Sequence, residues 1–142
     1  MLKGIPSILS PDLLKMLMEM GHGDEIVIAD GNFPSASIGQ RVIRLDGHGV
    51  PEILDAVLKV MPLDTYVDEP VQLMDLSGDD TETPPIWSEY QIIINKHQED
   101  VSIGKTERYA FYERAKKAYG VIATGETAIY ANILLKKGVV IQ

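Results

Sequence analysis

The sequence predicts an α/β fold: one three-layer domain spanning residues 1–142, with helices on both faces of a central mixed, largely parallel sheet. Short apolar runs bounded by turn residues alternate along the chain with segments whose apolar residues recur every three or four positions. No long series of strands occurs without an intervening helix, as expected when helices connect the strands. The length of 142 residues, with 45% hydrophobic and 24% charged residues, matches one ordinary globular domain.

The first third of the chain is predicted to form a helix, a strand and a loop. Ser10 suits a helix N-cap and Pro11 the first helical position, while Gly21 ends the apolar helical pattern. Residues 25–29 form an apolar run between polar turn residues, which is typical of a buried strand. Residues 30–37 have the composition of a loop. This loop follows the carboxyl end of the strand, where open α/β sheets bind ligands.

The middle of the chain is predicted to contain two strands and two helices. We expect the strands at residues 41–46 and 71–76. Residues 51–60 carry an apolar helical face, and residues 85–97 show the strongest helical spacing in the chain. Residues 77–85 form an acidic loop rich in Asp, Thr and Pro. We interpret the acidic residues from Asp68 to Glu82 as a solvated loop, with calcium as the alternative ligand to test.

The last third of the chain is predicted to complete the sheet. Residues 101–105 indicate a short strand, and residues 107–119 a helix with aromatic residues in its first turns. Residues 120–125 form a second buried strand. Residues 133–140 indicate the final strand, interrupted by the sequence Lys-Lys-Gly at 136–138.

Composition excludes several functions. Cysteine is absent, which removes disulfides, thiolate metal sites and cysteine nucleophiles and fits a reducing cytoplasm. The net charge of −8 argues against binding to a phosphate backbone, so nucleic acid is not an expected partner. No apolar run approaches the length needed to span a membrane, so no membrane partner is expected either. We therefore expect a cytoplasmic protein.

A histidine between two glycines is the leading catalytic candidate. His22 can both give and take a proton near neutral pH, and glycine on each side allows a ligand to approach the backbone. Asp30, at the end of the following strand, is its candidate acid partner. Each residue also has a structural interpretation: His22 as a helix C-cap and Asp30 as an Asx turn. Residues 26–29 span roughly 13 Å when extended, so the two side chains meet only if residues 21–25 fold back beside the strand.

Other motifs give weaker signals. His48 lies in a second Gly-His-Gly, but no carboxylate at a strand end pairs with it in the same way, so a turn is favoured. The sequence Gly-Lys-Thr at 104–106 resembles the end of a phosphate loop, but Glu99 occupies the position of the first glycine. The three histidines lack the spacing of a zinc helix, and we expect no metal.

Three polar residues in the last third indicate a hydroxyl-rich ligand. Arg108 lies near a helix N-terminus, where its charge opposes the helix dipole, so it is expected to have another role. Tyr130 and Asn132 are separated by one residue at the start of a strand and therefore point to the same face. A phenol, an amide and a guanidinium together supply hydrogen-bond donors and acceptors for such a ligand.

The whole chain resembles the L-fucose mutarotase and D-ribose pyranase family. The matching segments run from end to end: Glu19-Met20-Gly21-His22-Gly23-Asp24-Glu25 with Asp30 and Phe33-Pro34, then Phe111-Tyr112-Glu113-Arg114-Ala115, Thr124-Gly125-Glu126, and Tyr130-Ala131-Asn132-Ile133-Leu134-Leu135-Lys136-Lys137-Gly138-Val139. The ribose-type branch carries His where this chain has Arg108, so the chain looks like the fucose-type branch.

The resemblance implies an isomerase without a cofactor that interconverts the α and β anomers of a free monosaccharide, here L-fucose. D-ribose stays open as a further substrate. It implies His22 as proton donor with Asp30 as its partner, and a sugar contacted by Asp30, Arg108 and residues 130–132, which are Tyr130, Ala131 and Asn132. It also implies a ring-shaped homo-oligomer, a decamer in bacteria, with sites shared between subunits.

The hypothesis of mechanism is general acid–base catalysis. His22, held by Asp30, would act on one side of the sugar and Tyr130 on the other, with Tyr112 and Tyr119 left open as alternative phenols. A non-catalytic sugar-binding or regulatory module is the alternative function. A phosphosugar isomerase is disfavoured by the acidic charge and the failed phosphate motif.

Overall fold

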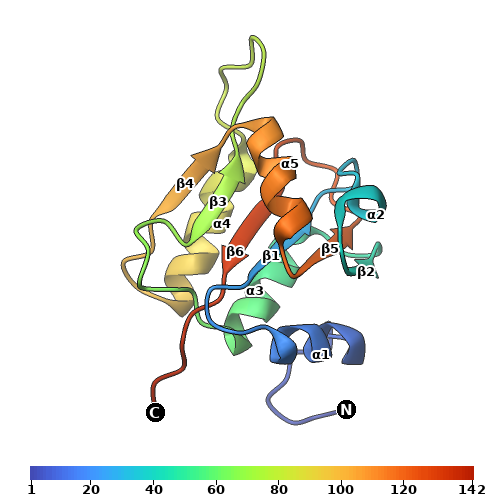
Figure 1. Cartoon of the computed structure of the whole chain (residues 1–142), viewed down its shortest axis with the longest axis vertical. Helices are drawn as coiled ribbons and strands as arrows, with labels where there is room; N and C mark the ends of the chain where they lie inside the picture. The colour runs from blue at the N-terminus through green and yellow to red at the C-terminus, as the bar shows by residue number, and fades with distance from the viewer.

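The computed structural model describes all 142 residues and contains one six-stranded mixed sheet of order β2-β5-β1-β6-β3-β4 (Figure 1). Three neighbouring pairs are parallel and two, both involving β6, are antiparallel, so β6 alone runs against the other strands. The predicted α/β class is confirmed. The strands are β1 (Glu25–Ala29), β2 (Val42–Leu45), β3 (Val71–Met74), β4 (Ile103–Thr106), β5 (Gly120–Thr124) and β6 (Ile133–Lys136). The helices are α1 (Pro11–Glu19), α2 (Ser35–Ile38), α3 (Val50–Val60), α4 (Pro85–His97) and α5 (Arg108–Lys117).

Helices cover both faces of the sheet and make the three predicted layers (Figure 1). Alternate residues of β1 point to opposite faces. Ile26 and Ile28 belong to a cluster of 26 buried residues that also contains side chains of α1, α3 and α4. Val27 and Ala29 belong to a second cluster, of 9 buried residues, that contains Phe111 and other residues of α5.

The ends of several elements differ from the predictions for local reasons. The chain predicted as a loop after β1 forms the short helix α2, which packs on the same face as α5. The last strand ends at Lys136. Beyond it, Lys137 pairs with Leu63 only in an isolated bridge, and the Gly138 N–H donates to the carbonyl of Pro62. α5 begins at Arg108 because the carboxylate of Glu107 accepts hydrogen bonds from the backbone N–H groups of Tyr109 and Ala110.

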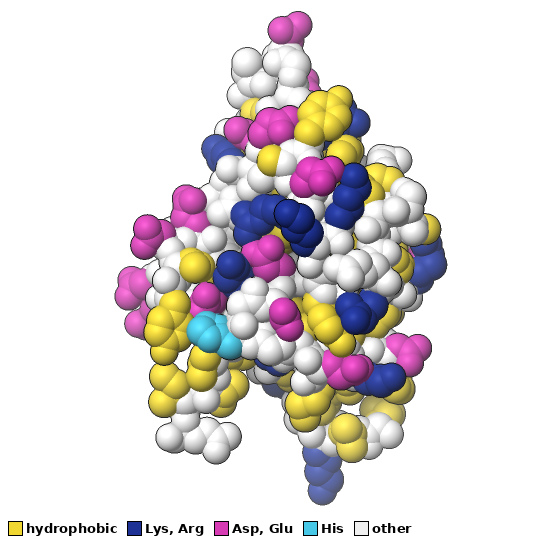
Figure 2. Space-filling model, viewed as in Figure 1, with side chains coloured by type: hydrophobic (Ala, Val, Ile, Leu, Met, Phe, Trp, Pro, Cys, Tyr) yellow, Lys and Arg dark blue, Asp and Glu magenta, His cyan; other side chains and the backbone are white.

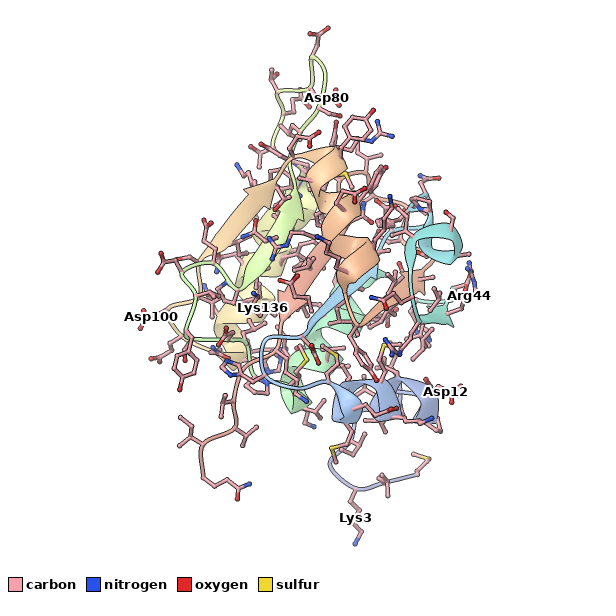
Figure 3. All side chains as sticks on the ribbon, in the orientation of Figure 1. Lys3, Asp12, Arg44, Asp80, Asp100 and Lys136 are labelled. Carbon is pink, nitrogen blue, oxygen red and sulfur yellow. The ribbon has the colours of Figure 1, made fainter.

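The strand directions bring different strand ends to the two edges of the sheet. The carboxyl ends of β1, β3 and β4 meet at one edge, together with the amino end of β6. The loop of residues 75–84 projects beyond this edge, at the top of Figure 1, and carries Asp80, which is labelled in Figure 3. The turn before β1 and the chain after β6 lie at the opposite edge. None of the helices combines the length and the apolar character needed to cross a membrane.

Candidate active site

A cavity of about 360 Å³ opens at the edge formed by the carboxyl ends of β1 and β3. It contains four of the five residues expected to bind a ligand, namely Asp30, Arg108, Tyr130 and Asn132. The other lining residues are Asn32, Phe33, Met74, Ser77, Asp80, Tyr112 and Ile129. The strand directions bring these residues together, because the chain leaves β1, β3 and β4 and enters β6 at this edge.

Asp30 is the buried carboxylate of this cavity, with 6% of its surface exposed. Burial raises the pKa of Asp30, the nearby Glu126 raises it further, and backbone N–H groups of residues 32, 131 and 33 oppose the rise. The Asn32 N–H donates to its carboxylate at 3.0 Å, which is the predicted Asx turn. Its own N–H donates to the Asn132 side-chain oxygen at 2.8 Å. That bond leaves the Asn132 NH₂ group as a donor for a ligand.

Ala131 differs from its neighbours, because it is fully buried and does not line the cavity. Its carbonyl accepts a 2.6 Å hydrogen bond from the Tyr90 hydroxyl. Its N–H is one of the groups that face Asp30. The structure therefore gives Ala131 a backbone role beside the cavity rather than a side-chain contact with a ligand.

Tyr130 is held in an unusual backbone conformation. Its φ of 56° lies in the left-handed region, and its carbonyl accepts a 2.8 Å hydrogen bond from the Trp87 indole. Its hydroxyl donates to the carboxylate of Asp80 and lies 3.3 Å from both the backbone nitrogen and the hydroxyl oxygen of Ser77. A phenol has one donor and two acceptor positions, so the loop of residues 75–84 takes up the hydrogen-bonding capacity of Tyr130.

Arg108 and Tyr112 form the second pair of polar groups in the cavity. The Arg108 Nε–H donates to the Tyr112 hydroxyl at 3.2 Å, and this bond raises the pKa of Arg108. The guanidinium carbon lies 5.5 Å from the centre of the Tyr112 ring and 5.6 Å from that of Tyr109. These contacts explain why an arginine occupies the first turn of α5 despite the helix dipole.

His22 lies at the opposite edge of the sheet, and its partner is Asp64. The His22 Nε2 is 2.9 Å from the Asp64 carboxylate, and the side chains are 45% and 4% exposed. Burial raises the pKa of Asp64, but hydrogen bonds from His22 and from the Tyr66 N–H outweigh it, and the pKa is lowered overall. The Tyr66 ring lies 5.0 Å from the His22 ring.

The predicted pairing of His22 with Asp30 is wrong within one chain. The Gly23 N–H donates to the carbonyl of Lys137 at 2.9 Å, so the chain before β1 continues beside β6 and does not fold back along β1. His22 therefore precedes the amino end of β1 and Asp30 follows its carboxyl end. The five residues of β1 alone separate them by roughly 16 Å.

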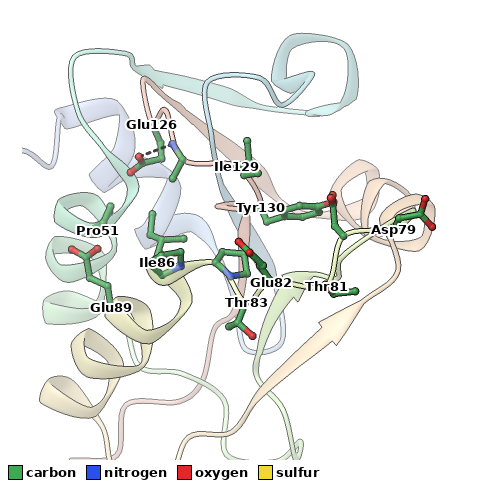
Figure 4. A pocket seen from close by; sticks show the side chains of 14 residues that line it. Pro51, Asp79, Thr81, Glu82, Thr83, Ile86, Glu89, Glu126, Ile129 and Tyr130 are labelled. Atoms are coloured by element: carbon green, nitrogen blue, oxygen red, sulfur yellow. Dashed lines mark hydrogen bonds between the residues drawn. The ribbon is translucent and has the colours of Figure 1, made fainter.

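A second cavity of about 730 Å³ adjoins the first and shares Asp80, Ile129 and Tyr130 with it (Figure 4). Its polar lining is dominated by carboxylates. One of these, Glu126, accepts hydrogen bonds from the N–H groups of Val50 at 3.0 Å and Ala128 at 3.1 Å. Glu126 thus holds the chain at the start of α3, and no histidine, arginine or lysine lines this cavity.

The other candidates from the sequence have structural contacts. His48 lies 3.1 Å from Glu52 at the start of α3, as expected for a turn. His97 lies 2.6 Å from Asp55 and joins α4 to α3. Residues 104–106 lie in β4 rather than in a phosphate loop. No group of three or more His, Cys, Asp or Glu side chains is arranged to hold a metal ion.

Comparison with known proteins places the chain in a family. The model of the RbsD / FucU transport protein family matches residues 3–140. This chain belongs to the RbsD / FucU family. The fucose mutarotase of Homo sapiens is 54% identical over 144 residues, which cover 97% of this chain and 94% of that protein. The L-fucose mutarotase of Actinobacillus pleuropneumoniae is 46% identical over 98% of this chain and 97% of that protein.

Solved structures of RbsD / FucU proteins have the same fold. The fucose mutarotase from Streptococcus pneumoniae, solved in complex with L-fucose, matches with a TM-score of 0.94 and 55% identity over 99% of this chain and 100% of that one. Bacillus subtilis RbsD, solved with D-ribose, matches with a TM-score of 0.73 over 99% of this chain and 100% of that one. Its identity of 23% supports the fold alone. The predicted resemblance is confirmed.

Sequence reasoning missed two contacts of this RbsD / FucU protein. Asp64 is 42 residues from His22, and no motif around it marks it as a partner. Asp80 lies in the segment interpreted only as a solvated acidic loop, yet its carboxylate contacts Tyr130. The signal available for Asp80 was its position after a strand that ends at the edge where the cavity opens.

Proposed function

We propose that this protein is an L-fucose mutarotase, an isomerase that interconverts α- and β-L-fucose. The main support for this activity is that Asp30, Arg108 and Asn132 share one cavity with Tyr130, in a chain that matches fucose mutarotases over nearly its full length. A cavity of about 360 Å³ lies at the small end of the range for ligand sites, as expected for a monosaccharide.

The reaction requires two proton transfers. A base removes the proton of the anomeric hydroxyl, and an acid protonates the ring oxygen while the bond from C1 to that oxygen breaks. The open aldehyde then turns and recloses on its other face, with both protons returned. General acid–base catalysis accelerates such steps by roughly 10²–10⁴-fold, and the reaction moves only protons, so we propose that it needs no cofactor.

His22 is the proposed acid and base on one side of the sugar. With its Nε2–H donated to the Asp64 carboxylate, the ring presents Nδ1 for proton exchange. A carboxylate in this position holds the imidazole in one tautomer and stabilises its protonated form. Asp64 therefore takes the role that the sequence suggested for Asp30.

Tyr112 is the proposed proton partner on the other side. Its hydroxyl accepts one hydrogen bond from Arg108 and keeps its own proton, and the guanidinium stabilises the negative charge left on the oxygen when that proton moves. The Tyr130 hydroxyl, first expected in this role, is bonded to Asp80 and Ser77. We propose that Tyr130 lines the site and holds the loop instead.

Asp30 and Asn132 are proposed to orient the sugar hydroxyls. The Asp30 carboxylate supplies acceptors and the Asn132 NH₂ group a donor, both fixed by the bond between the two residues. Arg108 adds further donors at the same cavity. Because a ribose-type protein carries His at the position of Arg108, we expect L-fucose to be preferred over D-ribose.

We infer that the complete site lies between two copies of the chain. The His22 and Asp64 side chains and the cavity lie at opposite edges of one sheet, so a sugar in the cavity requires His22 of a second copy. Such a head-to-tail contact closes into a ring when the rotation permits. We propose a ring-shaped homo-oligomer, a decamer as in the bacterial proteins that the chain resembles.

Exposed apolar side chains at both edges support this assembly. Tyr66, beside His22, is 74% exposed, and Ile129, in the cavity wall, is 67% exposed. The segment after β6 also ends in exposed apolar residues, and hydrophobic side chains are visible over the lower end of the molecule in Figure 2. Apolar side chains of this size commonly mark contact surfaces when they gather.

Magnetisation transfer between the α- and β-fucose NMR resonances tests the function. We expect the protein to accelerate exchange, and His22→Ala to abolish most of that acceleration without dissociating the assembly. Binding of L-fucose without acceleration would support a non-catalytic sugar-binding module instead. The same assay with D-ribose measures pyranase activity.

We also infer a cytoplasmic location, supported by the lack of cysteine, and we infer no nucleic-acid or membrane partner.

A further inference from the structure

Residues 136–138, a Lys-Lys-Gly sequence, lie between the turn that carries His22 and the segment that carries Asp64. On one side the Asp64 N–H donates to the Lys136 carbonyl at 3.0 Å, and the Gly138 N–H donates to Pro62 at 2.8 Å. A Cβ added to Gly138 would lie 2.6 Å from the Leu63 carbonyl oxygen, so this close approach requires glycine.

On the other side, the backbone of Lys137 is bonded to the chain that follows His22. Its N–H donates to the Asp24 carbonyl at 2.9 Å, and its carbonyl accepts from the Gly23 N–H at 2.9 Å. Residues 136–138 therefore set the distance between the two backbones that carry His22 and Asp64.

The side chain of Lys137 reaches the chain that precedes His22. Its Nζ donates to the carbonyl of Leu17 at 2.8 Å and to that of Met20 at 2.5 Å. Carbonyls at the end of a helix have no partner within the helix, and a cation there is favoured by the helix dipole. The ammonium group of Lys137 thus connects the carboxyl end of α1 to the end of β6, to which the turn of residues 20–24 is bonded.

We propose that Lys137 is a positioning residue for His22, which holds the turn of residues 20–24 so that the imidazole meets Asp64. Contacts from Lys137 reach Met20 before His22 and Gly23 and Asp24 after it, so the turn is fixed from both ends. No other lysine or arginine reaches the carbonyls of Leu17 and Met20. This inference rests on the proposed function, because it gives His22 a role in proton transfer.

The test replaces Lys137 by Met in the assembled protein and measures anomer exchange and L-fucose affinity separately. We expect the exchange rate constant to fall about tenfold, because a misplaced catalytic group loses rate steeply with displacement. The fucose dissociation constant is expected to stay within about twofold, since Lys137 is bonded to the chain on either side of His22 and not to Asp30, Arg108 or Asn132, which are proposed to bind the sugar. Lys59→Met removes an exposed lysine from the last turn of α3 and is the matched control, with unchanged exchange.

A double-mutant comparison separates positioning from a general effect on stability. In a His22→Ala background, Lys137→Met is expected to cause no further loss of exchange, because its effect passes through His22. Lys137→Arg keeps the charge and the donors and is expected to retain at least about a third of the rate constant. If Lys137→Met does not fold, Lys137→Gln takes its place, with an expected loss of about threefold.

Three results would overturn the inference: wild-type exchange by folded Lys137→Met, an equal further loss in the His22→Ala background, or a loss of fucose affinity that accounts for the lost rate. Wild-type exchange by His22→Ala would instead refute the proposed role of His22. The two failures are therefore distinguishable.

Discussion

Replacing Asp64 by Asn is predicted to slow anomer exchange. The Asp64 side chain is 4% exposed and accepts the hydrogen bond of His22 at 2.9 Å, so water does not substitute for the carboxylate. An amide of the same shape has no charge. Either its oxygen accepts the hydrogen bond from Nε2–H, or its NH₂ group turns toward the ring and favours the other tautomer. Both outcomes remove the charged partner of His22 in the proposed proton transfer.

The magnitude follows from the loss of one charge-assisted hydrogen bond. Such a bond contributes about 1.5–3 kcal/mol, compared with about 0.5–1.5 kcal/mol for a neutral one. A difference of about 1–2 kcal/mol in the transition state, at about 1.4 kcal/mol per tenfold, corresponds to a fall of about 5- to 30-fold. The effect must not exceed that of His22→Ala, because Asp64 acts through His22.

Asp64→Asn also changes the pH dependence of stability. Because the pKa of Asp64 is lowered in the folded protein, its ionised form stabilises the fold above the unfolded pKa, which is about 3.9. That contribution is lost as the pH falls through the folded pKa. The wild type should therefore exceed Asp64→Asn in unfolding free energy at pH 7, and the difference should shrink toward pH 3, as measured by urea denaturation.

Magnetisation transfer between α- and β-L-fucose at pH 7 measures the exchange, and light scattering confirms that the variant is assembled. Asp46→Asn is the control, because Asp46 is an exposed carboxylate, 57% exposed, paired with Arg44 at 2.8 Å. It should exchange fucose as the wild type does. Exchange by assembled Asp64→Asn within twofold of the wild type would refute the dependence of His22 on Asp64.

Three further predictions test the site. Co-assembly of His22→Ala chains with Asp30→Asn chains should give more exchange than either variant alone, because about one quarter of sites between subunits would combine two intact halves. No gain on mixing would indicate sites within one chain. Asp30→Asn alone should raise the melting temperature at pH 7 by a few degrees, since burial disfavours the charged form of Asp30. The same variant should bind fucose more weakly in calorimetry. An unchanged or lower melting temperature would contradict the first expectation. Tyr112→Phe should reduce exchange about 100-fold and Tyr130→Phe less than about tenfold. Only Tyr130→Phe should speed proteolysis of the loop of residues 75–84. A larger loss of exchange in Tyr130→Phe than in Tyr112→Phe would restore Tyr130 as the proton partner.

Local patterns predicted most of the fold. Strand β1 and helix α4 have the predicted bounds, because each is determined by short-range signals: an apolar run between turns, or apolar residues at helical spacing after prolines. The last strand was predicted too long. Gly138 leaves the ladder, because its N–H donates to the carbonyl of Pro62, and no local pattern encodes a partner that far away in the sequence.

The residues around the candidate cavity were predicted better than the contacts of His22. Asp30, Arg108, Tyr130 and Asn132 share a cavity, as the positions of the strand ends indicated. His22 was assigned the wrong carboxylate, because its nearness to Asp30 along the chain is not nearness in space when an extended strand separates them.

The sequence by itself determined the alternation of strands and helices, the polar residues at the edge where the cavity opens and the glycine-flanked histidine, since these depend on residue type and spacing. The tertiary structure alone decided which groups meet. Asp64 reaches His22 from 42 residues away because β1 and β3 run in the same direction on either side of β6, which places the chain before each of them at one edge. The length of β1 separates that edge from the cavity, and this separation is the reason for proposing that the two halves of the site come from different copies of the chain.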